Sequence, residues 1–369
     1  MSKLFLNYPY INQNGVEDSI ATSLNCLRST TYLILKNKYK MEYYTPYFLE
    51  DLSLKLVKNE KNDICDLDIN RLYNVEDLSL NLINSFIQYK NYKSNDPIKT
   101  IRTLLDHEML LVCPDMLYLP FSRFYDPLHK DFSAVNIHGF LLIHYDNENY
   151  YYVEGKTHLN KDKSKIRKYK GDIGIIDANT FEKALNETTN IYTVSLKNHS
   201  MDNVMKWDRM LFKSICNHYN AEYCVDDKTV LLGRKALEEL IHICQFDQRS
   251  LLDTVTEVHA SDKNLYTILN WRLWEMQLSR EFLACYLKEN FAPLDIVEDI
   301  INHLKNSIKT VSNFNHYLSK QWYAQNYNFD TQYVDYIQNI MIYDDIVYED
   351  INNKLINKIS HTKTEAISC

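Results

Sequence analysis

Glycine and proline are scarce in this chain, and both are unevenly placed. The 369 residues include only 6 glycines and 7 prolines. Five of the glycines lie at or before Gly174, and six of the prolines lie at or before Pro127. Because these residues punctuate turns and loops, we expect loops to be concentrated in the first half. The second half keeps only Gly233 and Pro293, which favours long helices.

Cysteine is too thinly spread for a disulfide scaffold, and a reducing compartment is the simpler interpretation. No CxxC pair occurs among the 8 cysteines, at positions 26, 65, 113, 216, 224, 244, 285 and 369. Long apolar runs are also lacking: the longest, such as 109–113 and 140–143, are too short to cross a bilayer. The first residues contain no apolar signal-peptide core. These absences predict a cytoplasmic protein with no membrane partner.

A basic excess is missing as well. The 41 Lys and Arg against 49 Asp and Glu leave a net charge of −8, which argues against a nucleic-acid partner. The composition, 45% hydrophobic and 24% charged, supplies a large core and excludes wholesale disorder. The length suggests two domains of roughly 100–200 residues.

The first part of the chain is predicted to be an α+β domain covering residues 1–197. Apolar spacing predicts helices from about Ser23 or Asn25 to Lys38, over 48–57 and 75–89, and from Asp96 to about His107. Strands are predicted at 109–113, 137–145, 150–154, 174–177 and 191–196, with a turn at 146–149 and a short helix over 178–185. Helices followed by a mostly antiparallel sheet are typical of this class.

The remainder, residues 198–369, is predicted to be an all-α domain. Apolar residues recur at helical spacing over 204–215, 236–243, 265–287, 296–311 and 334–356. A helical domain with so many apolar positions is compatible with a homodimer.

Cys26 is the candidate nucleophile. It lies in the first turn of the helix predicted over 23–38, where unpaired N–H groups and the helix dipole favour a thiolate. The same N–H groups offer a donor to a developing oxyanion. The alternative is a buried, inert cysteine, so the catalytic interpretation needs a base within reach.

His138 and Glu154 complete a candidate triad. His138 opens an otherwise apolar strand, and Glu154 closes the next one. If the hairpin is centred near Asp146, the two residues face each other across the ladder, with Cβ atoms about 5 Å apart. A carboxylate there would hold the imidazole tautomer and stabilise the imidazolium. The alternative is a cross-strand pair without chemical consequence.

These motifs resemble a known family. Residues 25–35, NCLRSTTYLIL, resemble the cysteine-plus-helix opening of the butirosin-biosynthesis protein H family, acyltransferases of papain-like lineage. Residues 138–146 resemble its His-φ-φ-φ-φ-Gly-Tyr-Asp strand, with His144 in place of Gly, and Glu154 stands where Asp is usual. Residues 118–123 resemble its Pro-aromatic segment. The resemblance covers about residues 7–197, and the chain is also similar to the cysteine-protease-like type of enzyme that forms amide bonds in closthioamide assembly.

The resemblance implies a papain-like fold and cysteine-dependent acyl transfer in specialised metabolism. His138 would deprotonate Cys26, and the thiolate would attack a thioester on an acyl or peptidyl carrier protein to give an acyl-Cys26 intermediate. A small amine would then accept the acyl group as an amide, in a site that excludes water or binds the amine in place. The enzyme would need no metal or cofactor of its own, because phosphopantetheine arrives on the carrier protein.

Two departures from the papain-like pattern concern the site. Ile20 stands where an oxyanion-hole Gln is usual, about six residues before the cysteine. The substitutes are Gln13, Asn14 or Asn25, or the backbone N–H of Cys26 with another donor. Glu154 also lengthens the orienting arm by one methylene relative to Asp.

A basic segment follows Glu154 and is a docking candidate for an acidic carrier protein. Seven cations against one acid, Asp162, give 7 − 1 = +6 over fifteen residues; the cations are Lys156, Lys161, Lys163, Lys165, Arg167, Lys168 and Lys170. The alternative is a solvated loop, because charge runs commonly serve solvation.

Two further groups of residues favour structural roles. Zinc sites need closer, paired spacing than the set Cys216, His218, Cys224, His242 and Cys244. Trp271, Trp274 and Trp322 fit helix packing better than a ligand pocket. An acyltransferase is therefore the leading hypothesis, with a cysteine peptidase on the same scaffold and a non-catalytic binding protein as alternatives.

Overall fold

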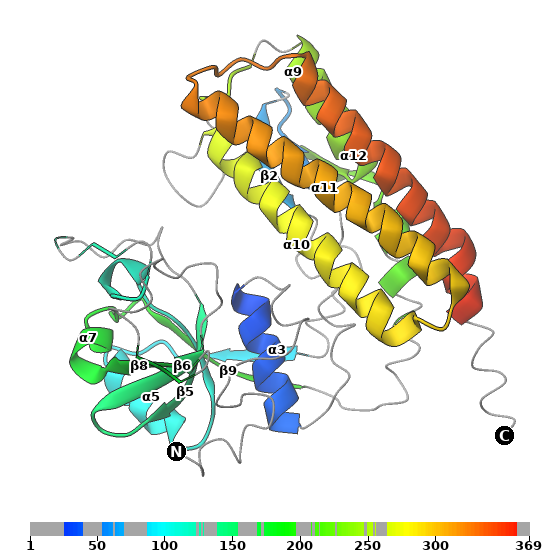
Figure 1. Cartoon of the computed structure of the whole chain (residues 1–369). Helices are drawn as coiled ribbons and strands as arrows, with labels where there is room; N and C mark the ends of the chain where they lie inside the picture. Colours follow the sequence, from blue (N-terminus) through cyan, green and yellow to red (C-terminus); the bar gives the residue numbers. More distant parts are fainter. Residues whose placement is uncertain are drawn as a thin grey trace, which may run out of the picture. The chain divides into compact units, whose positions relative to one another are not determined.

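The computed structural model of the chain contains two compact units (Figure 1). The first combines Met1–Phe48 with Ile83–His199, and the second combines Leu49–Leu82 with Ser200–Cys369. The structure describes residues 26–39, 54–61, 63–69, 87–122, 125, 126, 128, 139–153, 168–170, 173–196, 208, 211–213, 215–225, 227–246, 249–253, 255 and 264–359.

Unit 1 is built on a seven-stranded antiparallel sheet with the order β3-β9-β4-β5-β6-β8-β7. The strands are β3 (Ile87–Asn91), β4 (Leu110–Cys113), β5 (Phe140–Tyr145), β6 (Asn149–Val153), β7 (Lys168–Lys170), β8 (Ile173–Asp177) and β9 (Asn190–Leu196). The helices are α3 (Cys26–Tyr39), α5 (Pro97–Leu105) and α7 (Ala178–Glu182), with a 3-10 turn over Met116–Tyr118. The α+β class predicted for this region is confirmed.

Helix α5 begins where the sequence indicates. Asp96 caps it, because its Oδ1 accepts the backbone N–H of Lys99 at 2.9 Å, and Pro97 occupies the first turn. α5 and α7 cover one face of the sheet with a core that includes Leu105, Phe140 and Phe181. On that face Tyr152 lies over Gly174, where an added Cβ would be only 2.0 Å from the ring Cζ. Glycine is therefore required opposite this tyrosine.

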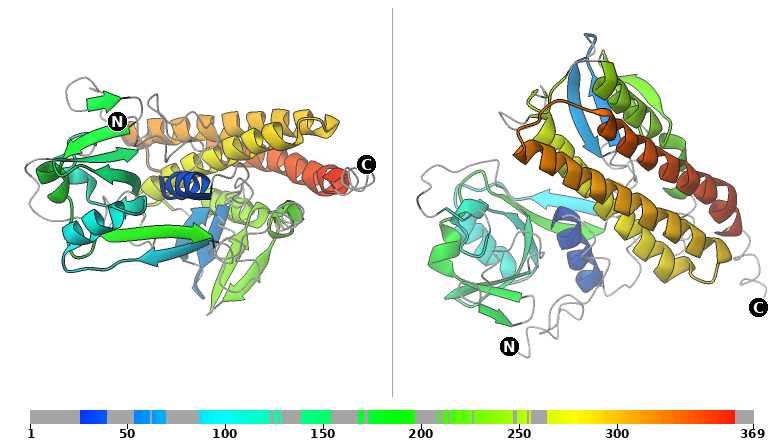
Figure 2. Two further views of the ribbon diagram at one scale, coloured as in Figure 1. Left: turned by 90° about the horizontal axis from the view of Figure 1, so that it is seen from below. Right: turned by 45° about the horizontal axis from the view of Figure 1, so that its top comes forward.

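Helix α3 packs against β4, β5 and β9 on the other face of the sheet. Tyr89 and Tyr192 lie on that face with ring centroids 6.2 Å apart, and the Tyr89 hydroxyl is 3.1 Å from Oγ1 of Thr31 in α3. Tyr192 pairs with Leu111, so Leu111 shares the α3 face, while its neighbour Val112 belongs to the core beneath α5. Figure 2 shows α3 and α5 on opposite sides of the sheet.

Unit 2 joins a four-stranded antiparallel sheet to long helices. The sheet has the order β10-β11-β1-β2, from β1 (Leu54–Lys58), β2 (Ile64–Ile69), β10 (Glu222–Val225) and β11 (Lys228–Leu232). The helices are α9 (Arg234–Phe246), α10 (Leu265–Phe291), α11 (Asp295–Tyr323) and α12 (Thr331–Asp350), and a π-helix over Ile351–Leu355 continues α12. α10, α11 and α12 run side by side (Figures 1 and 2).

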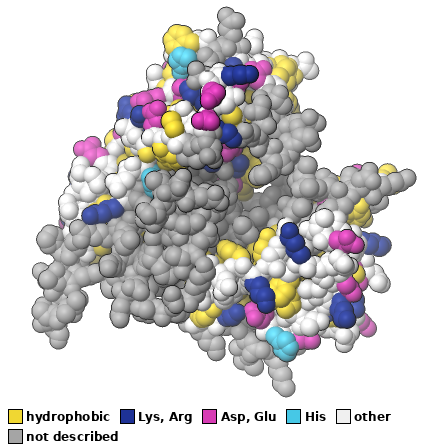
Figure 3. Space-filling view, turned by 180° about the vertical axis from the view of Figure 1, so that it is seen from behind, with side chains coloured by type: hydrophobic (Ala, Val, Ile, Leu, Met, Phe, Trp, Pro, Cys, Tyr) yellow, Lys and Arg dark blue, Asp and Glu magenta, His cyan; other side chains and the backbone are white. Residues whose placement is uncertain are grey.

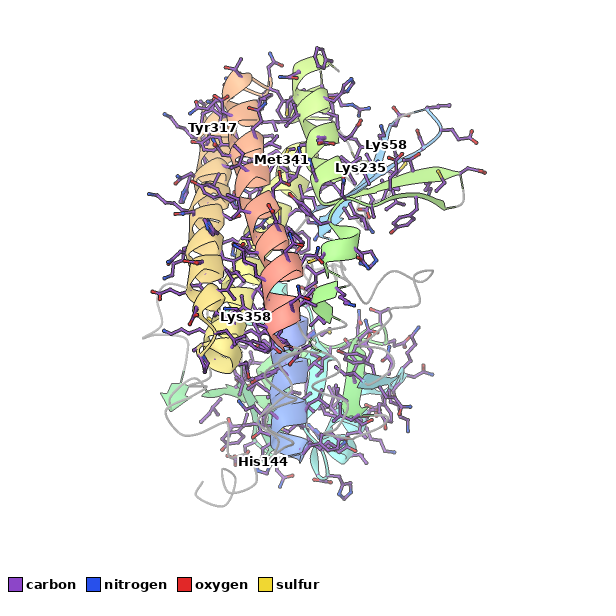
Figure 4. All side chains as sticks on the ribbon, turned by 90° about the vertical axis from the view of Figure 1, so that its right-hand side faces the viewer. Lys58, His144, Lys235, Tyr317, Met341 and Lys358 are labelled. Atoms are coloured by element: carbon purple, nitrogen blue, oxygen red, sulfur yellow. The ribbon has the colours of Figure 1, made fainter. Side chains whose placement is uncertain are left out.

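Ion pairs tie α9 to the sheet of unit 2. Lys58 of β1 lies 2.9 Å from Glu239 of α9, and Lys235 of α9 lies 2.6 Å from Glu222 of β10 (Figure 4). Beneath them, apolar residues of the sheet and all four helices form one core cluster. That cluster includes Leu56, Leu240, Leu269 and Ile337.

Several predictions about secondary structure were wrong. Residues 54–57 of the helix predicted over 48–57 form strand β1, and 87–89 of the helix predicted over 75–89 belong to strand β3. Strands β10 and β11 interrupt the region predicted to be all-α, and the helices α9, α10, α11 and α12 follow them. The β1–β2 hairpin pairs with β11, so a single boundary near residue 197 does not account for it.

Candidate functional site

Cys26 is the first residue of helix α3 as described, and for residues 26–28 the description covers the backbone alone. The helix is buried through its middle: Tyr32 and Leu35 are 0% exposed. A cysteine at this position therefore leads directly into a helix fixed against the sheet. The helical environment predicted for Cys26 is confirmed.

The far end of α3 is held by polar contacts. Lys38 lies 2.9 Å from Glu108 and donates to the carbonyl oxygen of Val194 at 3.4 Å. The backbone N–H of Leu196 donates to the hydroxyl of Tyr39 at 2.9 Å. These contacts fix the last turn of α3 on β9, so the helix that starts with Cys26 has a defined position on the sheet.

His138 and Glu154 lie outside the described residues, but both border described strands. His138 is two residues before Phe140, where β5 starts, and Glu154 directly follows Val153, where β6 ends. β5 and β6 pair with each other, and α3 contacts β5. The three candidate residues thus flank elements that pack together.

The expected register of the β5–β6 hairpin was wrong. A pairing of residue 138 with residue 154 corresponds to Leu141 opposite Tyr151, whereas Leu141 pairs with Val153. The difference comes from the turn, which joins Tyr145 to Tyr150, and from a bulge between Leu142 and His144. Because the shift is two residues, it preserves which side chains share a face.

The turn itself lies where it was predicted, at 146–149. Asp146 holds it: Oδ1 accepts the backbone N–H groups of Glu148 and Asn149, and Oδ2 accepts the hydroxyl of Tyr151 at 2.7 Å. Asn147 adopts a φ of 76°. The Asp146 side chain therefore stabilises the turn.

Cys113 and Gly139 lie together where β4 ends and β5 begins. A Cβ added at Gly139 would be 3.2 Å from Cδ1 of Leu111 and 3.5 Å from Sγ of Cys113. Burial raises the pKa of Tyr192, as does the nearby Cys113 thiol. Cys113 was not among the candidate site residues identified from the sequence, and the one sequence signal for its position is Gly139, directly after His138.

The predicted docking segment lies almost wholly outside the described residues. Its last residues form β7, at the edge of the sheet, and only their backbone is described. On the face seen in Figure 3, cationic and anionic side chains of the described surface are interspersed. The described part of that face presents no single-sign region for an acidic partner.

The described cysteines, histidines and tryptophans of unit 2 have structural surroundings. Among the described residues, no group of three or more His, Cys, Asp or Glu side chains could hold a metal ion. Cys224 is exposed on β10, and burial raises the pKa of Cys244 in α9 to about 12. The ring of Trp322 stacks on Tyr266 at 4.1 Å beside the core of unit 2, whereas Trp271 is 42% exposed.

No family model and no curated protein matches this chain. Among the described helices, none combines the length and apolar character that crossing a membrane requires.

Proposed function

We propose that the chain is a cysteine-dependent acyltransferase that forms amides, with a papain-like arrangement in unit 1. The observation that carries the proposal is the packing of α3, which starts at Cys26, against β5, which starts just after His138. A nucleophile at a helix start and a base at the entry of a contacting strand are the two groups that such chemistry needs.

In the proposed reaction, His138 takes the proton from the Cys26 thiol. The thiolate attacks the carbonyl carbon of a thioester, and the carbon–sulfur bond to the donor breaks. The donor thiolate leaves and takes the proton from the imidazolium. A primary amine then attacks acyl-Cys26, its proton passes to His138, and the Cys26 sulfur leaves as the amide forms.

Backbone N–H groups at the start of α3 suit the charge that develops on the carbonyl oxygen. The first turn of a helix has unpaired N–H groups and a positive dipole end, and both favour a thiolate and an oxyanion. This role is important here because Ile20 replaces the usual oxyanion glutamine. Glu154 would orient the imidazole through its other ring nitrogen.

The alternation of side chains along β5 restricts how His138 can reach Cys26 in the proposed site. Gly139 shares the α3 face with Leu111, and strict alternation would turn residue 138 toward the opposite face. The described β4–β5 ladder ends at Phe140, so Gly139 itself already lies outside it. The proposal therefore requires the chain to leave the extended conformation before Gly139.

The proposed donor is an acyl or peptidyl carrier protein, and the proposed compartment is the cytoplasm, where the thiol stays reduced. A thioester has a good leaving group, so its cleavage needs less electrophilic assistance than peptide hydrolysis. Carrier docking at the segment containing Lys156–Lys170 and a homodimer through unit 2 belong to the same proposal.

The proposal is tested with an acyl N-acetylcysteamine thioester, which mimics the pantetheine arm, and a panel of primary amines. Intact-mass analysis should find one acyl group on the wild-type protein and none on Cys26→Ala. Cys224→Ala is the matched control, because Cys224 is exposed on β10 of unit 2 and should acylate like the wild type at Cys26.

The products separate the alternatives. Amide formation that depends on Cys26 supports the transferase. Acylation followed by release of free acid, whatever the amine, assigns a hydrolase such as a peptidase. Acylation that persists in Cys26→Ala contradicts the proposed nucleophile.

A further inference from the structure

The outer edge of strand β10 in unit 2 has no strand partner among the described residues. β10 is the end strand of the four-stranded sheet and is paired on one side, with β11. The ladder joins Glu222 to Leu231, Tyr223 to Val230, Cys224 to Thr229 and Val225 to Lys228. The two strands form a hairpin that extends outward beside α9 (Figure 4).

The hydrogen bonds of the hairpin show which backbone groups of β10 face outward. The N–H of Leu232 donates to the carbonyl oxygen of Ala221 at 3.0 Å, one step beyond the first pair of the ladder. Hydrogen-bonded and non-hydrogen-bonded pairs alternate along an antiparallel ladder, so Glu222 and Cys224 occupy non-hydrogen-bonded positions. Their N–H and C=O groups therefore point away from β11, and both residues are exposed.

The opposite edge of the same sheet is covered. β2 is the end strand there, and α10 packs against it. Nε of Arg272 in α10 donates to the carbonyl oxygen of Leu67 at 3.0 Å, and the register of β1 with β2 shifts between Val57 and Lys58. Covering elements and bulges keep sheet edges from pairing with another chain. Among the described residues, β10 has neither protection.

A charged residue on an edge strand ordinarily discourages pairing, but the charge on β10 is compensated. Glu222 forms an ion pair with Lys235 of α9, with Oε2 and Nζ 2.6 Å apart (Figure 4). The next two residues of the strand, Tyr223 and Cys224, carry no formal charge. Two such edges would each bring one anion with its own cation, so they would not repel each other.

We propose that β10 pairs antiparallel with β10 of a second copy of this chain, around a two-fold axis beside Tyr223, and joins the two sheets into one. In this register Glu222 of each copy lies opposite Cys224 of the other, so every outward N–H meets an outward carbonyl oxygen. An axis beside Glu222 would place like charges opposite each other. An axis beside Cys224 would place Glu222 beyond the end of the second strand.

This inference names the contact for the homodimer proposed above, and it does not depend on acyl transfer. An interface of two short strands buries little surface, so the dimer should be transient and dependent on concentration.

Analytical ultracentrifugation of the reduced full chain over a range of concentrations measures the dimer. Cys224→Pro removes one outward N–H from each copy and leaves the bonds between β10 and β11 in place, because proline is tolerated on edge strands. We expect it to weaken dimerisation at least about tenfold, since one of the two hydrogen bonds of each pair is lost. Cys224→Ala is the matched control: it removes the same thiol, keeps the N–H and should dimerise like the wild type.

Oxidative cross-linking tests the register and keeps the test decisive if Cys224→Pro fails to fold. In a Cys224→Ala background, Tyr223→Cys places two thiols across the axis at a non-hydrogen-bonded pair, with Cα atoms about 4.5 Å apart, which suits a disulfide. Glu222→Cys in the same background should link far less, since its two copies would lie beyond roughly 7 Å. Peptide mass spectrometry identifies the linked residues.

The contrary outcomes are distinct. A wild type that stays monomeric at every concentration overturns the inference and leaves the edge open to a strand of another protein. A dimer that persists unchanged in folded Cys224→Pro, or a Tyr223→Cys variant that never links, refutes the β10 contact. Acylation of Cys26 should survive in Cys224→Pro, so failure of this inference leaves the acyltransferase proposal standing.

Discussion

Arg280 and Asp344 form an ion pair in the core of unit 2, with Nη2 of the guanidinium 2.9 and 2.7 Å from the two carboxylate oxygens. The side chains are 0% and 1% exposed. Nε of Arg280 donates to Ser307 Oγ at 2.9 Å, so the network joins α10, α11 and α12. A charged side chain this deeply buried is stable only when an opposite charge compensates for its lost hydration.

Removing one member of this pair should be costly. Asp344→Ala leaves the guanidinium buried without a counter-charge, and we expect a loss of about 3–5 kcal/mol in the free energy of unfolding. The double variant Arg280→Met with Asp344→Leu removes both charges and should be far closer to wild type. Urea denaturation measures both. A double variant as unstable as Asp344→Ala would contradict this explanation.

Tyr152 and Gly174 give a prediction for unit 1. Gly174→Ala places a Cβ inside the Tyr152 ring, and we expect a loss of about 1–3 kcal/mol from the forced repacking. In a Tyr152→Ala background the same glycine substitution should cost much less, because the ring is gone. A double-mutant cycle by chemical denaturation checks this, and equal penalties in the two backgrounds would show that the contact is not responsible.

Two tyrosines in unit 2 should respond differently to loss of the hydroxyl. Among the described buried side chains, Tyr333 is the one whose hydroxyl has no hydrogen-bond partner, whereas the Tyr317 hydroxyl donates to Asp330. Tyr333→Phe should therefore be neutral or stabilising, and Tyr317→Phe should cost about 1 kcal/mol. Thermal unfolding of the two variants, which remove the same atom, measures how much each hydroxyl contributes to stability. Marked destabilisation by Tyr333→Phe would contradict the assignment.

Asp177 should contribute to stability in a pH-dependent way. Hydrogen bonding to Thr180 at the start of α7 lowers the pKa of Asp177 below its ordinary value of 3.8. A lowered pKa in the folded state means that the stabilisation is complete above the ordinary pKa and is lost as the pH falls below it. Asp177→Asn, which keeps a capping oxygen, should remove that acid-side dependence and change stability little at pH 7. Denaturation curves at pH 3 and pH 7 provide the comparison.

Sequence patterns were sufficient to predict secondary structure where local signals were strong. The Asp96-Pro97 start of α5, the turn at 146–149 and the apolar strand at 110–113 all have short-range causes, which a sequence displays directly. The long helices of unit 2 follow from apolar periodicity and from the scarcity of glycine and proline after residue 174, where only Gly233 and Pro293 occur.

Other elements depended on long-range pairing, which a sequence does not display. Leu54, Leu56 and Val57 fit a helix or a strand equally well, and pairing with β11, far along the chain, decides for the strand. The signal that was missed is the turn that follows, where Asn59 Oδ1 accepts the N–H groups of Lys61 and Asp63. The register of β5 with β6 was predicted wrongly because the hairpin was centred near Asp146, whereas the turn joins Tyr145 to Tyr150 and a bulge between Leu142 and His144 changes the pairing again.

The candidate site could be predicted to a similar extent. The helical position of Cys26 followed from local periodicity, whereas the Cys113–Gly139 contact depends on strands paired across an intervening segment. Which face of the sheet each strand residue occupies could also be determined only from the structure. In the proposed dyad, His138 would have to leave the pleat of β5 to meet Cys26, because Gly139 shares the α3 face with Leu111.

The distance between the Cys26 sulfur and the His138 ring nitrogens tests the central claim most directly. An experimental structure of the full chain, with Cys26 reduced, measures it. We predict a separation within about 5 Å, allowing for the looser geometry of an unliganded site. An imidazole directed to the α5 face of the sheet, with no path to the sulfur, would contradict the proposed dyad.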